Sequence, residues 1–424
     1  MPNDPRPHIV IIGGGFAGLY ATQSLARHAV RITVVDRKNH HTFQPLLYQV
    51  ATAALSPADI ASPIRGILRG RKNVNVLLDE AVGFDLAARR VKLRELQLEY
   101  DYLIVAAGAT HAYFGHDEWE PFAPGLKTLE DALEIRRRVL LAYEVAERRA
   151  ASGMPSGPLN FVIVGAGPTG AELAGALAEI AHQALIRDFR HIDPSKARII
   201  LLEGGPRILP AYPEGLSRKA EAQLRRLRVE VRTSTMVTAV ESGAVMIGSE
   251  RLPSAVTLWA AGVSASPLGK MLGAKTDRAG RVQVEPDLSI AGHPEVFVIG
   301  DLASLLDEKG KPVPGVAPAA IQQGQKAAAN ILCDLRQKPR SRFIYWDKGS
   351  LATIGRAAAI ADLPGGVRLS GLLAWLAWLF IHILFLIGFR NRLLVIIQWA
   401  WAYLTFQRGT RLITGKTDMP GLKT

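Results

Sequence analysis

The sequence predicts an α/β protein with two doubly wound domains of one plan, the second inserted in the first, followed by an apolar helical C-terminal segment. Two segments predict the paired domains: His8–Ala26 and Leu159–Ala178 each read as a short β-branched strand, a glycine loop and a helix of small residues. Two long uncharged runs after Arg368 predict the terminal helices.

Composition narrows the class of protein. With 424 residues, 48% of them apolar and 21% charged, the chain suits a multidomain globular protein and is not disordered. The net charge of +13 predicts an anionic partner. Because the basic excess of the tail lies beside apolar runs, we expect phospholipid rather than nucleic acid. The residues are Arg368, Arg390, Arg392, Arg408, Arg411, Lys416 and Lys423, against the one acid Asp418.

The single cysteine, Cys333, excludes an intramolecular disulfide and redox chemistry on a cysteine pair. No residue spacing suggests a metal site. The first strand begins within a few residues of Met1, which leaves no room for a cleavable signal, so we expect a location in the cytoplasm or on the cytoplasmic face of the cell membrane.

The order of segments predicts the domain boundaries. Ala151–Pro158 reads as a linker, and the later strand Glu295–Asp301 reads as the return of the chain to the first domain. We therefore expect a first domain at 1–125 and 273–339, an inserted domain at 126–272 and a C-terminal region at 340–424.

Both glycine loops have the G-x-G-x-x-G spacing that lets a backbone approach a pyrophosphate at a helix N-terminus. One such loop could be only a tight turn. Two loops, each followed by an acid at the end of a second strand, predict two Rossmann-like dinucleotide sites. The glycines are Gly13, Gly15 and Gly18 in the first loop and Gly165, Gly167 and Gly170 in the second.

The two strand-end acids are Asp36 and Glu203. Each is placed to accept hydrogen bonds from an adenosine ribose, and a carboxylate at Glu203 would repel the 2′-phosphate of NADPH. Glu203 therefore favours NADH in the second site. Arg207, four residues further on, leaves a phosphate-binding alternative open.

Two dinucleotide sites in one chain suggest one retained cofactor and one exchanging substrate. We assign a flavin to the first site, where Gly300 allows close approach and Asp301 could accept from the ribityl hydroxyls or cap the next helix. No attachment signal is evident, so the flavin is expected to be non-covalent. We expect His40 and His41 to serve packing rather than catalysis, since hydride transfer needs no imidazole base.

Beyond the loops, the chain resembles the type II NADH dehydrogenases, which are monotopic, non-proton-pumping NADH:quinone oxidoreductases. The resemblance is carried by His41–Pro57, Asp101–Ala109, Asp347–Arg356 and Leu386–Leu394. It implies FAD at the first loop, NADH at the second, and a quinone as electron acceptor. The implied FAD residues are Gly13, Gly15, Gly18, Asp36, Ala107, Gly108, Gly300 and Asp301.

Two further residues gain a role from this resemblance. Glu172, expected in the first turn of the helix after the second loop, resembles the acid that the family places near flavin, nicotinamide and quinone, although a helix dipole also favours an acid there. Gln322 matches the second glutamine of the family's A-Q-x-A-x-Q quinone motif, although a polar helix residue without a function would fit the sequence equally well. Pro318 replaces the first glutamine, which puts the pose of the quinone in doubt. The matching segments give Lys348 and Arg356 no role.

The uncharged run Leu369–Phe389 has 21 residues and could just span a bilayer, but Leu393–Phe406 has 14 and is too short to return. Arginines at every boundary favour two helices lying in the interface, with Trp375, Trp378, Trp399 and Trp401 at head-group depth. A buried dimer core is the alternative, and both could hold, so a homodimer is expected.

These observations predict a membrane-surface flavoprotein that transfers a hydride from NADH to FAD and two electrons to a quinone. Two other functions remain open at this stage. One is a reductase of a soluble electron-carrier protein, which would leave the apolar tail unexplained. The other is a membrane-tethered flavoprotein that senses NADH and acts through partners. The sequence does not identify the quinone.

Overall fold

The computed structural model describes residues 5–386, 389–405 and 410–415, with the side chains of 389–390 and 402–405 also left out. Arg390, Arg408, Lys416, Asp418 and Lys423 of the predicted basic tail therefore lie outside the described side chains. The chain divides into two compact units. The first holds residues 5–41, 61–110 and 263–348, and the second holds 42–60, 111–262 and the described residues from 349 onward.

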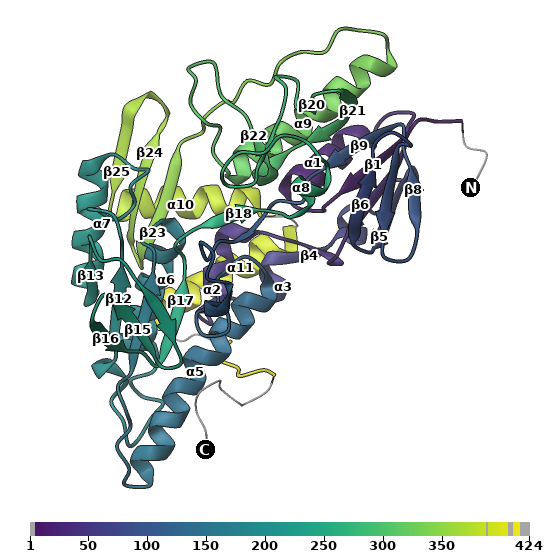
Figure 1. Ribbon diagram of the computed structural model, residues 1–424. Helices are drawn as coiled ribbons and strands as arrows, with labels where there is room; N and C mark the ends of the chain where they lie inside the picture. The colour runs from purple at the N-terminus through teal and green to yellow at the C-terminus, as the bar shows by residue number, and fades with distance from the viewer. Residues whose placement is uncertain (1–4, 387–388, 406–409, 416–424) are drawn as a thin grey trace. The chain divides into compact units, whose positions relative to one another are not determined.

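The first unit is built on a six-stranded sheet of order β20-β21-β9-β1-β2-β5 (Figure 1). Its strands are β1 His8–Ile12, β2 Arg31–Asp36, β5 Val74–Leu78, β9 Tyr102–Val105, β20 Ser289–Ile290 and β21 His293–Val298. β1 is buried at every position, as expected for a parallel strand covered on both faces. Because β21 pairs parallel with β9, the chain returns to this sheet late in the sequence, which confirms that the second domain is inserted in the first.

Helices and a small antiparallel sheet cover this core. The further elements of the first unit are α1 Phe16–Leu25, α4 Ile64–Ile67, α8 Leu268–Met271, α9 Ala317–Leu335, β6 Ala81–Asp85, β7 Arg90–Leu93, β8 Gln97–Glu99, β19 Val282–Gln283 and β22 Ala303–Ser304. A Cβ on Gly324 of α9 would lie 2.2 Å from the carbonyl oxygen of Ala17 in α1. The two helices therefore pack with their backbones in contact, which only glycine allows at this position.

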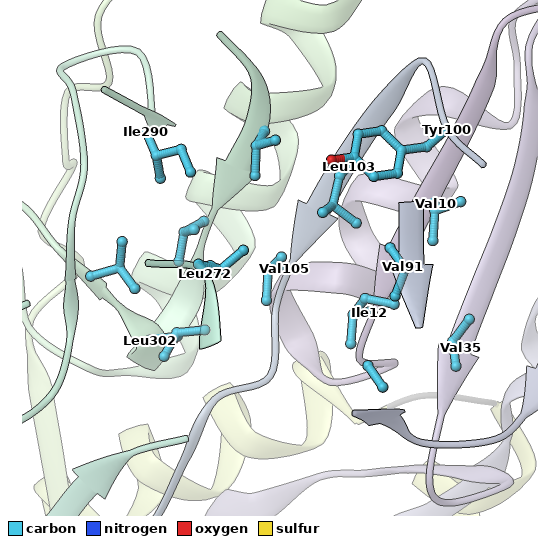
Figure 2. Packing of buried hydrophobic residues seen from close by; sticks show 14 of the residues in the cluster. Val10, Ile12, Val35, Val91, Tyr100, Leu103, Val105, Leu272, Ile290 and Leu302 are labelled. Atoms are coloured by element: carbon cyan, nitrogen blue, oxygen red, sulfur yellow. The ribbon is translucent and has the colours of Figure 1, made fainter. Parts of the chain in front are cut away.

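Figure 2 shows the apolar cluster that holds the first unit together. Val10 and Ile12 of β1 and Leu103 of β9 pack with Val91 of β7 and with Leu302. These residues come from segments separated by most of the chain length, so the cluster joins the N-terminal strands to the returning segment.

The second unit has a four-stranded parallel sheet of order β13-β12-β11-β17. Its elements are β11 Asn160–Val164, β12 Arg198–Leu202, β13 Val229–Arg232, β17 Val256–Trp259, α5 Leu129–Ala151, α6 Pro168–Glu179, α7 Glu214–Arg226 and the antiparallel strands β14 Ala239–Glu241, β15 Ala244–Ile247 and β16 Glu250–Pro253. α6 continues into a π-helical turn, Ile180–Ala184. α5 begins with a capping box between Thr128 and Asp131, which satisfies the first backbone donors of a 23-residue helix.

Short elements occur where the chain passes between the units. They are β3 His40–Thr42, β4 Ala61–Pro63, β10 Ala109–His111 and β18 Val263–Ala265, while α2 Leu47–Ala51 and α3 Pro57–Ile60 belong to the second unit. Residues 42–60, which the sequence-based division places in the first domain, group with the second unit because α2 packs against α5 and α6.

The C-terminal segment begins with an antiparallel sheet that the sequence analysis did not predict. Its strands are β23 Ser350–Gly355, β24 Ala358–Leu363 and β25 Val367–Ser370, followed by α10 Leu372–Phe385 and α11 Phe389–Thr405. The uncharged run Leu369–Phe389 is therefore not one helix, because β25 takes its first residues and Gly371, at φ +70°, separates strand from helix. Among the described residues, no helix has the length and apolar character needed to cross a bilayer.

Candidate active site

The glycine loop of the first unit joins β1 to α1, and each glycine has a distinct reason to be there. Gly13 has φ +102°, in the region that favours glycine. A Cβ on Gly18 would lie 1.9 Å from the carbonyl oxygen of Gly13, so α1 can only reach the loop without a side chain there. Gly15 at the helix N-cap has no atom within 4 Å of its Cβ position. The open side of the loop is therefore the side where helix N–H groups can meet an anion.

Asp36, at the end of β2, is tied to this loop. Its Oδ2 accepts from the backbone N–H of Gly14 at 2.6 Å, and its Oδ1 accepts from the N–H of Lys38 at 2.7 Å. Since each carboxylate oxygen can accept a second hydrogen bond, Asp36 is held in place and can still receive a ligand hydroxyl.

The remaining FAD residues predicted in the first unit lie beside the same loop. A Cβ on Gly13 would approach the carbonyl oxygen of Ala106 at 2.4 Å, just before Ala107 and Gly108, and Gly300 lies against Ala17 of α1. Gly108 and Gly300 have φ values of +68° and +74°. Asp301 follows in a short 3-10 turn, so it does not cap α9, which begins at Ala317.

A contact that the sequence analysis missed fixes Gly300. Its N–H donates to Oε1 of the buried Gln323 at 2.6 Å, so α9 holds the strand end through the glutamine next to the one that was predicted. The sequence shows two adjacent glutamines, Gln322 and Gln323, at the end of the quinone motif. Their spacing does not indicate which of the two side chains is buried.

His41 is buried beside the first loop. Its Nδ1–H donates to the carbonyl of Gly14 at 3.0 Å, and its ring meets Phe16 edge-on at 4.9 Å. Burial lowers the pKa of His41, which keeps the ring neutral. These contacts support the packing interpretation of His41.

The loop of the second unit repeats the geometry of the first. Gly165 has φ +97°, a Cβ on Gly170 would lie 1.9 Å from the carbonyl oxygen of Gly165, and Gly167 at the N-cap of α6 has open space. Glu203 accepts from the N–H of Ala166 at 2.7 Å through Oε2 and from the N–H of Gly205 at 2.8 Å through Oε1. The two loops are thus built alike at the level of single hydrogen bonds.

Arg207 is committed to a turn. One guanidinium nitrogen donates to the carbonyl of Tyr212 and the other to that of Pro210, both at 2.8 Å. These contacts favour a structural role for Arg207 over the phosphate-binding alternative.

Glu172 lies in the second turn of α6, and its expected place in the first turn is wrong. Pro168 opens the helix, and the first turn of α6 contains no acid. The helix-dipole explanation for Glu172 weakens accordingly, because the effect of the dipole is confined to the terminal turn.

The environment of Glu172 changes its acidity. Protein surrounds the carboxyl closely, while some of the side-chain surface remains accessible at the cavity described below. This burial raises the pKa of Glu172 to about 8, against the opposing effect of the backbone N–H of Thr353, which donates to the carboxylate. Glu172 therefore carries a proton at neutral pH. The carboxyls of Glu172 and Asp362 add to the effect of burial in raising the pKa of Tyr212.

A cavity of about 130 Å³ within the second unit has Glu172 in its wall. Its volume is comparable to the roughly 150 Å³ of an apolar cavity that takes up benzene. Four segments distant in sequence form the wall. They supply Tyr48, Gln49, Thr52 and Ala54, then Glu172, Ala176, Glu179, Gln183 and Ala184, then Thr353, Gly355 and Arg356, and finally Trp375, Trp378 and Trp399.

Polar groups lie among the aromatic side chains of this wall. The Trp399 Nε1–H donates to Oε1 of Gln49 at 2.7 Å, and Nε2 of Gln49 donates to the Tyr48 hydroxyl at 2.8 Å. Trp378 is 2% exposed, and its indole N–H has no acceptor within the described part of the chain. A buried donor of this kind is a ready partner for a ligand oxygen. Sequence reasoning placed Trp378 and Trp399 at lipid head groups and did not find the cavity.

Gln322, the other predicted catalytic residue, lies in the first unit, and its side-chain amide makes two hydrogen bonds to the backbone of Trp346. Its Nε2 donates to the Trp346 carbonyl at 3.0 Å, and its Oε1 accepts from the Trp346 N–H at 2.9 Å. Pro318 stands in the first turn of α9, where proline is tolerated. Lys348 lies over the Trp346 ring at 5.5 Å, and the backbone N–H of Arg356 donates to Glu179.

Comparison with known proteins defines the class to which this site belongs. Residues 7–324 match the family described as pyridine nucleotide-disulphide oxidoreductase, and residues 347–408 match the family described as NDH2 C-terminal domain. The first match covers most of the chain, so the protein is a member of the pyridine nucleotide-disulphide oxidoreductase class.

Two relatives narrow this class. A type II NADH:quinone oxidoreductase of Mycobacterium tuberculosis is 46% identical, covering 97% of this chain and 91% of the relative, and a second one from the same organism is 46% identical over 97% and 90%. The chain therefore belongs to the type II NADH:quinone oxidoreductases. A structure of NDH2 from Plasmodium falciparum in complex with NADH has the same fold, with a TM-score of 0.85, 21% identity and coverage of 97% and 100%.

The raised pKa of Glu172 predicts how Glu172→Gln changes stability with pH. Between pH 4.5 and about 8 the folded protein keeps a proton that the unfolded chain loses, so unmodified protein loses stability as pH rises. Glutamine has no proton to lose. The variant should match the unmodified protein near pH 5, gain on it by roughly 1 kcal/mol per pH unit between pH 5 and about 8, and gain no more above that. Denaturant titrations at pH 5, 7 and 8.5 measure the difference, and a constant difference would contradict the assignment.

Proposed function

We propose that this chain oxidises NADH and passes two electrons to a quinone, with FAD bound non-covalently in the first unit and NADH bound in the second. The observation that carries the proposal lies on α6. The helix begins at the second glycine loop, carries the protonated Glu172 one turn further on, and then forms a wall of an aromatic cavity.

The first unit fits FAD. The open side of the loop at Gly15 and the N-terminus of α1 would take the pyrophosphate, and Asp36 would accept from the adenosine ribose. Ala107, Gly108, Gly300 and Asp301 line the edge where β9 and β21 end, which is the expected place for the rest of the cofactor. Bound FAD would supply a redox centre that accepts a hydride from NADH and gives electrons to a quinone.

The second unit fits NADH. Gly165, Gly167 and Gly170 would allow the pyrophosphate to approach α6, and Glu203 would accept from the 2′-hydroxyl of the ribose. A 2′-phosphate would meet the carboxylate of Glu203 at close range. We therefore propose NADH rather than NADPH as the substrate.

The cavity in the second unit is the proposed quinone site. Its volume suits a single ring, and the buried indole N–H of Trp378 could donate a hydrogen bond to a quinone oxygen. Reduction of a quinone to a quinol consumes two protons, and Glu172 holds one at neutral pH in the cavity wall. We propose Glu172 as the proton donor. For Gln322, the two bonds to Trp346 favour a role in holding residues 343–348 over direct contact with the quinone.

We further propose that α10 and α11 lie on a membrane, on the cytoplasmic face, with a homodimer extending the same surface. Leu373, Leu376 and Phe380 of α10 are 65%, 48% and 67% exposed, and Ile397 and Trp401 of α11 are 54% and 59% exposed. A row of large apolar side chains of this kind marks a lipid or protein interface. Quinones are lipid-soluble, so contact with lipid at these helices would bring the substrate to the cavity.

The central test is the reaction of NADH-reduced protein with a short-chain quinone. The rate of quinone reduction should fall as pH rises through about 8, because Glu172 loses its proton. Glu172→Gln should retain the flavin spectrum, slow this half-reaction by about 10²-fold and remove the pH dependence. Reduction by NADH should stay within a few-fold. A variant with the pH profile of the unmodified protein would exclude Glu172 as donor, and the absence of any quinone reduction would refute the function.

Glu203→Gln should lower the preference for NADH over NADPH in kcat/KM by at least about tenfold, because the amide neither repels a phosphate nor accepts on both of its atoms. Arg207→Ala is the control and should leave the preference unchanged, since Arg207 holds the Pro210–Tyr212 turn. If Arg207→Ala selectively weakens the use of NADPH, the phosphate-binding alternative holds instead.

Replacing Leu373 and Phe380 together by glutamine should weaken binding to phosphatidylglycerol vesicles by at least about a hundredfold, since each buried apolar side chain is worth roughly 1.5–3 kcal/mol. Phe114→Gln is the matched control, because Phe114 is 69% exposed outside the apolar helices. Vesicle co-sedimentation measures both. Equal loss in the two proteins, or no loss in either, would argue against α10 as the membrane surface.

A further inference from the structure

Two parts of the cavity wall that are distant in sequence are held by residues that do not line the cavity themselves. One part is the turn after α2, where Ala54 lines the cavity between Ala53 and Leu55. The other is the end of the π-helical turn, where Gln183 and Ala184 line it. Both parts lie within the second unit.

The turn after α2 needs support from outside. Ala53 has φ +55°, in the left-handed region that is strained for a residue with a Cβ. Thr410, just beyond α11, supplies that support, because its hydroxyl lies 2.8 Å from the carbonyl oxygen of Ala53 and 3.3 Å from that of Leu55. It thus binds the carbonyls on both sides of the cavity-lining Ala54.

The end of the π-helical turn is held by the next residue of the chain. The Arg411 guanidinium donates to the carbonyl of Ala184 at 2.9 Å and pairs with the Asp188 carboxylate at 2.5 Å. Carbonyls in the last turn of a helix have no donor within the helix, so a cationic side chain stabilises them. Because Arg411 and Asp188 are 28% and 38% exposed, the ion pair is partly screened by water, and the bond to the Ala184 carbonyl is the contact that holds the wall.

We infer that Thr410 and Arg411 form a strap that sets the width of the cavity, with Arg411 as a positioning residue for the quinone ring. The inference rests on the proposed function of the cavity. Thr410 and Arg411 are adjacent in the chain and bind two parts of the wall that lie about 130 residues apart in the sequence. Without the strap, the Ala54 wall and the Ala184 wall are free to separate, and the ring loses its fixed place between them.

The geometry predicts a specific kinetic signature. Arg411→Ala should raise the KM for a short-chain quinone by about tenfold, because a looser wall binds the ring more weakly while the chemical step is unchanged. The rate with ferricyanide, a water-soluble acceptor that needs no ring site, should stay within about twofold. Thr410→Val removes the hydroxyl at almost constant volume and should act in the same direction with a smaller effect.

Arg225→Ala is the matched control. Arg225 also bridges a carboxylate and a backbone carbonyl, those of Glu221 and Val231, at 2.8 and 3.0 Å, but none of these residues lines the cavity. Its quinone KM should equal that of the unmodified protein. If Arg225→Ala and Arg411→Ala raise the KM alike, or if the ferricyanide rate falls in parallel with quinone reduction, the strap has a general structural role and the inference fails.

A second measurement does not depend on quinone chemistry. Trp375, Trp378 and Trp399 line the cavity, so the fraction of tryptophan fluorescence that acrylamide quenches poorly in the unmodified protein reports access to it. Quenching should increase in Arg411→Ala and in Thr410→Val, and not in Arg225→Ala. If the unmodified protein reduces no quinone, the proposed function fails while this result still decides whether the strap closes the cavity. Unchanged quenching together with an unchanged quinone KM would overturn the inference.

Discussion

The contact between a helix and the strand end that precedes it governs the second unit. Gly170 lets α6 approach the carbonyl of Gly165, and Gly175 lets the next turn approach β23, since a Cβ there would lie 1.6 Å from the carbonyl oxygen of Ile354. Glycine at both positions allows one helix to pack closely against the glycine loop after β11 and against β23. As a result, the loop for an anion, the proton of Glu172 and the cavity wall all lie along the same rigid element.

This packing desolvates the carboxyl of Glu172 and thereby raises its pKa. Packing of α6 against β23 removes water from the carboxyl of Glu172, while the backbone N–H of Thr353 donates to this carboxyl and favours its charged form. A carboxyl in this situation keeps its proton up to about pH 8. Asp36 and Glu203 each accept two backbone N–H groups at a strand end, which fixes the position of both carboxylates. Acids of similar chemistry thus receive different tasks from the density of donors around them.

Local spacing was enough to predict the loops, the strand-end acids and the insertion of one domain in the other, because each depends on a few neighbouring residues. The cavity could not be predicted, since its wall joins Tyr48, Glu172, Thr353 and Trp378 through tertiary packing alone. The sheet β23–β25 was missed because the apolar run that continues from β25 reads as a single helix until Gly371 is seen to break it. For Gln322 and Gln323, adjacent amides of one helix differ in burial, which a sequence motif does not encode.

The C-terminal segment contributes to two features that a lipid-soluble substrate needs, an apolar surface and a cavity for its ring. Its exposed side presents large apolar side chains, while Trp378 and Trp399 turn to the cavity and Thr410 and Arg411 bind its walls. The hydrogen bond from Trp399 to Gln49 connects α11 directly to the α2 wall. If α10 and α11 rest on a membrane, as proposed, their displacement would be transmitted to the cavity through the hydrogen bond between Trp399 and Gln49, and the width of the proposed ring site would depend on the state of the membrane surface.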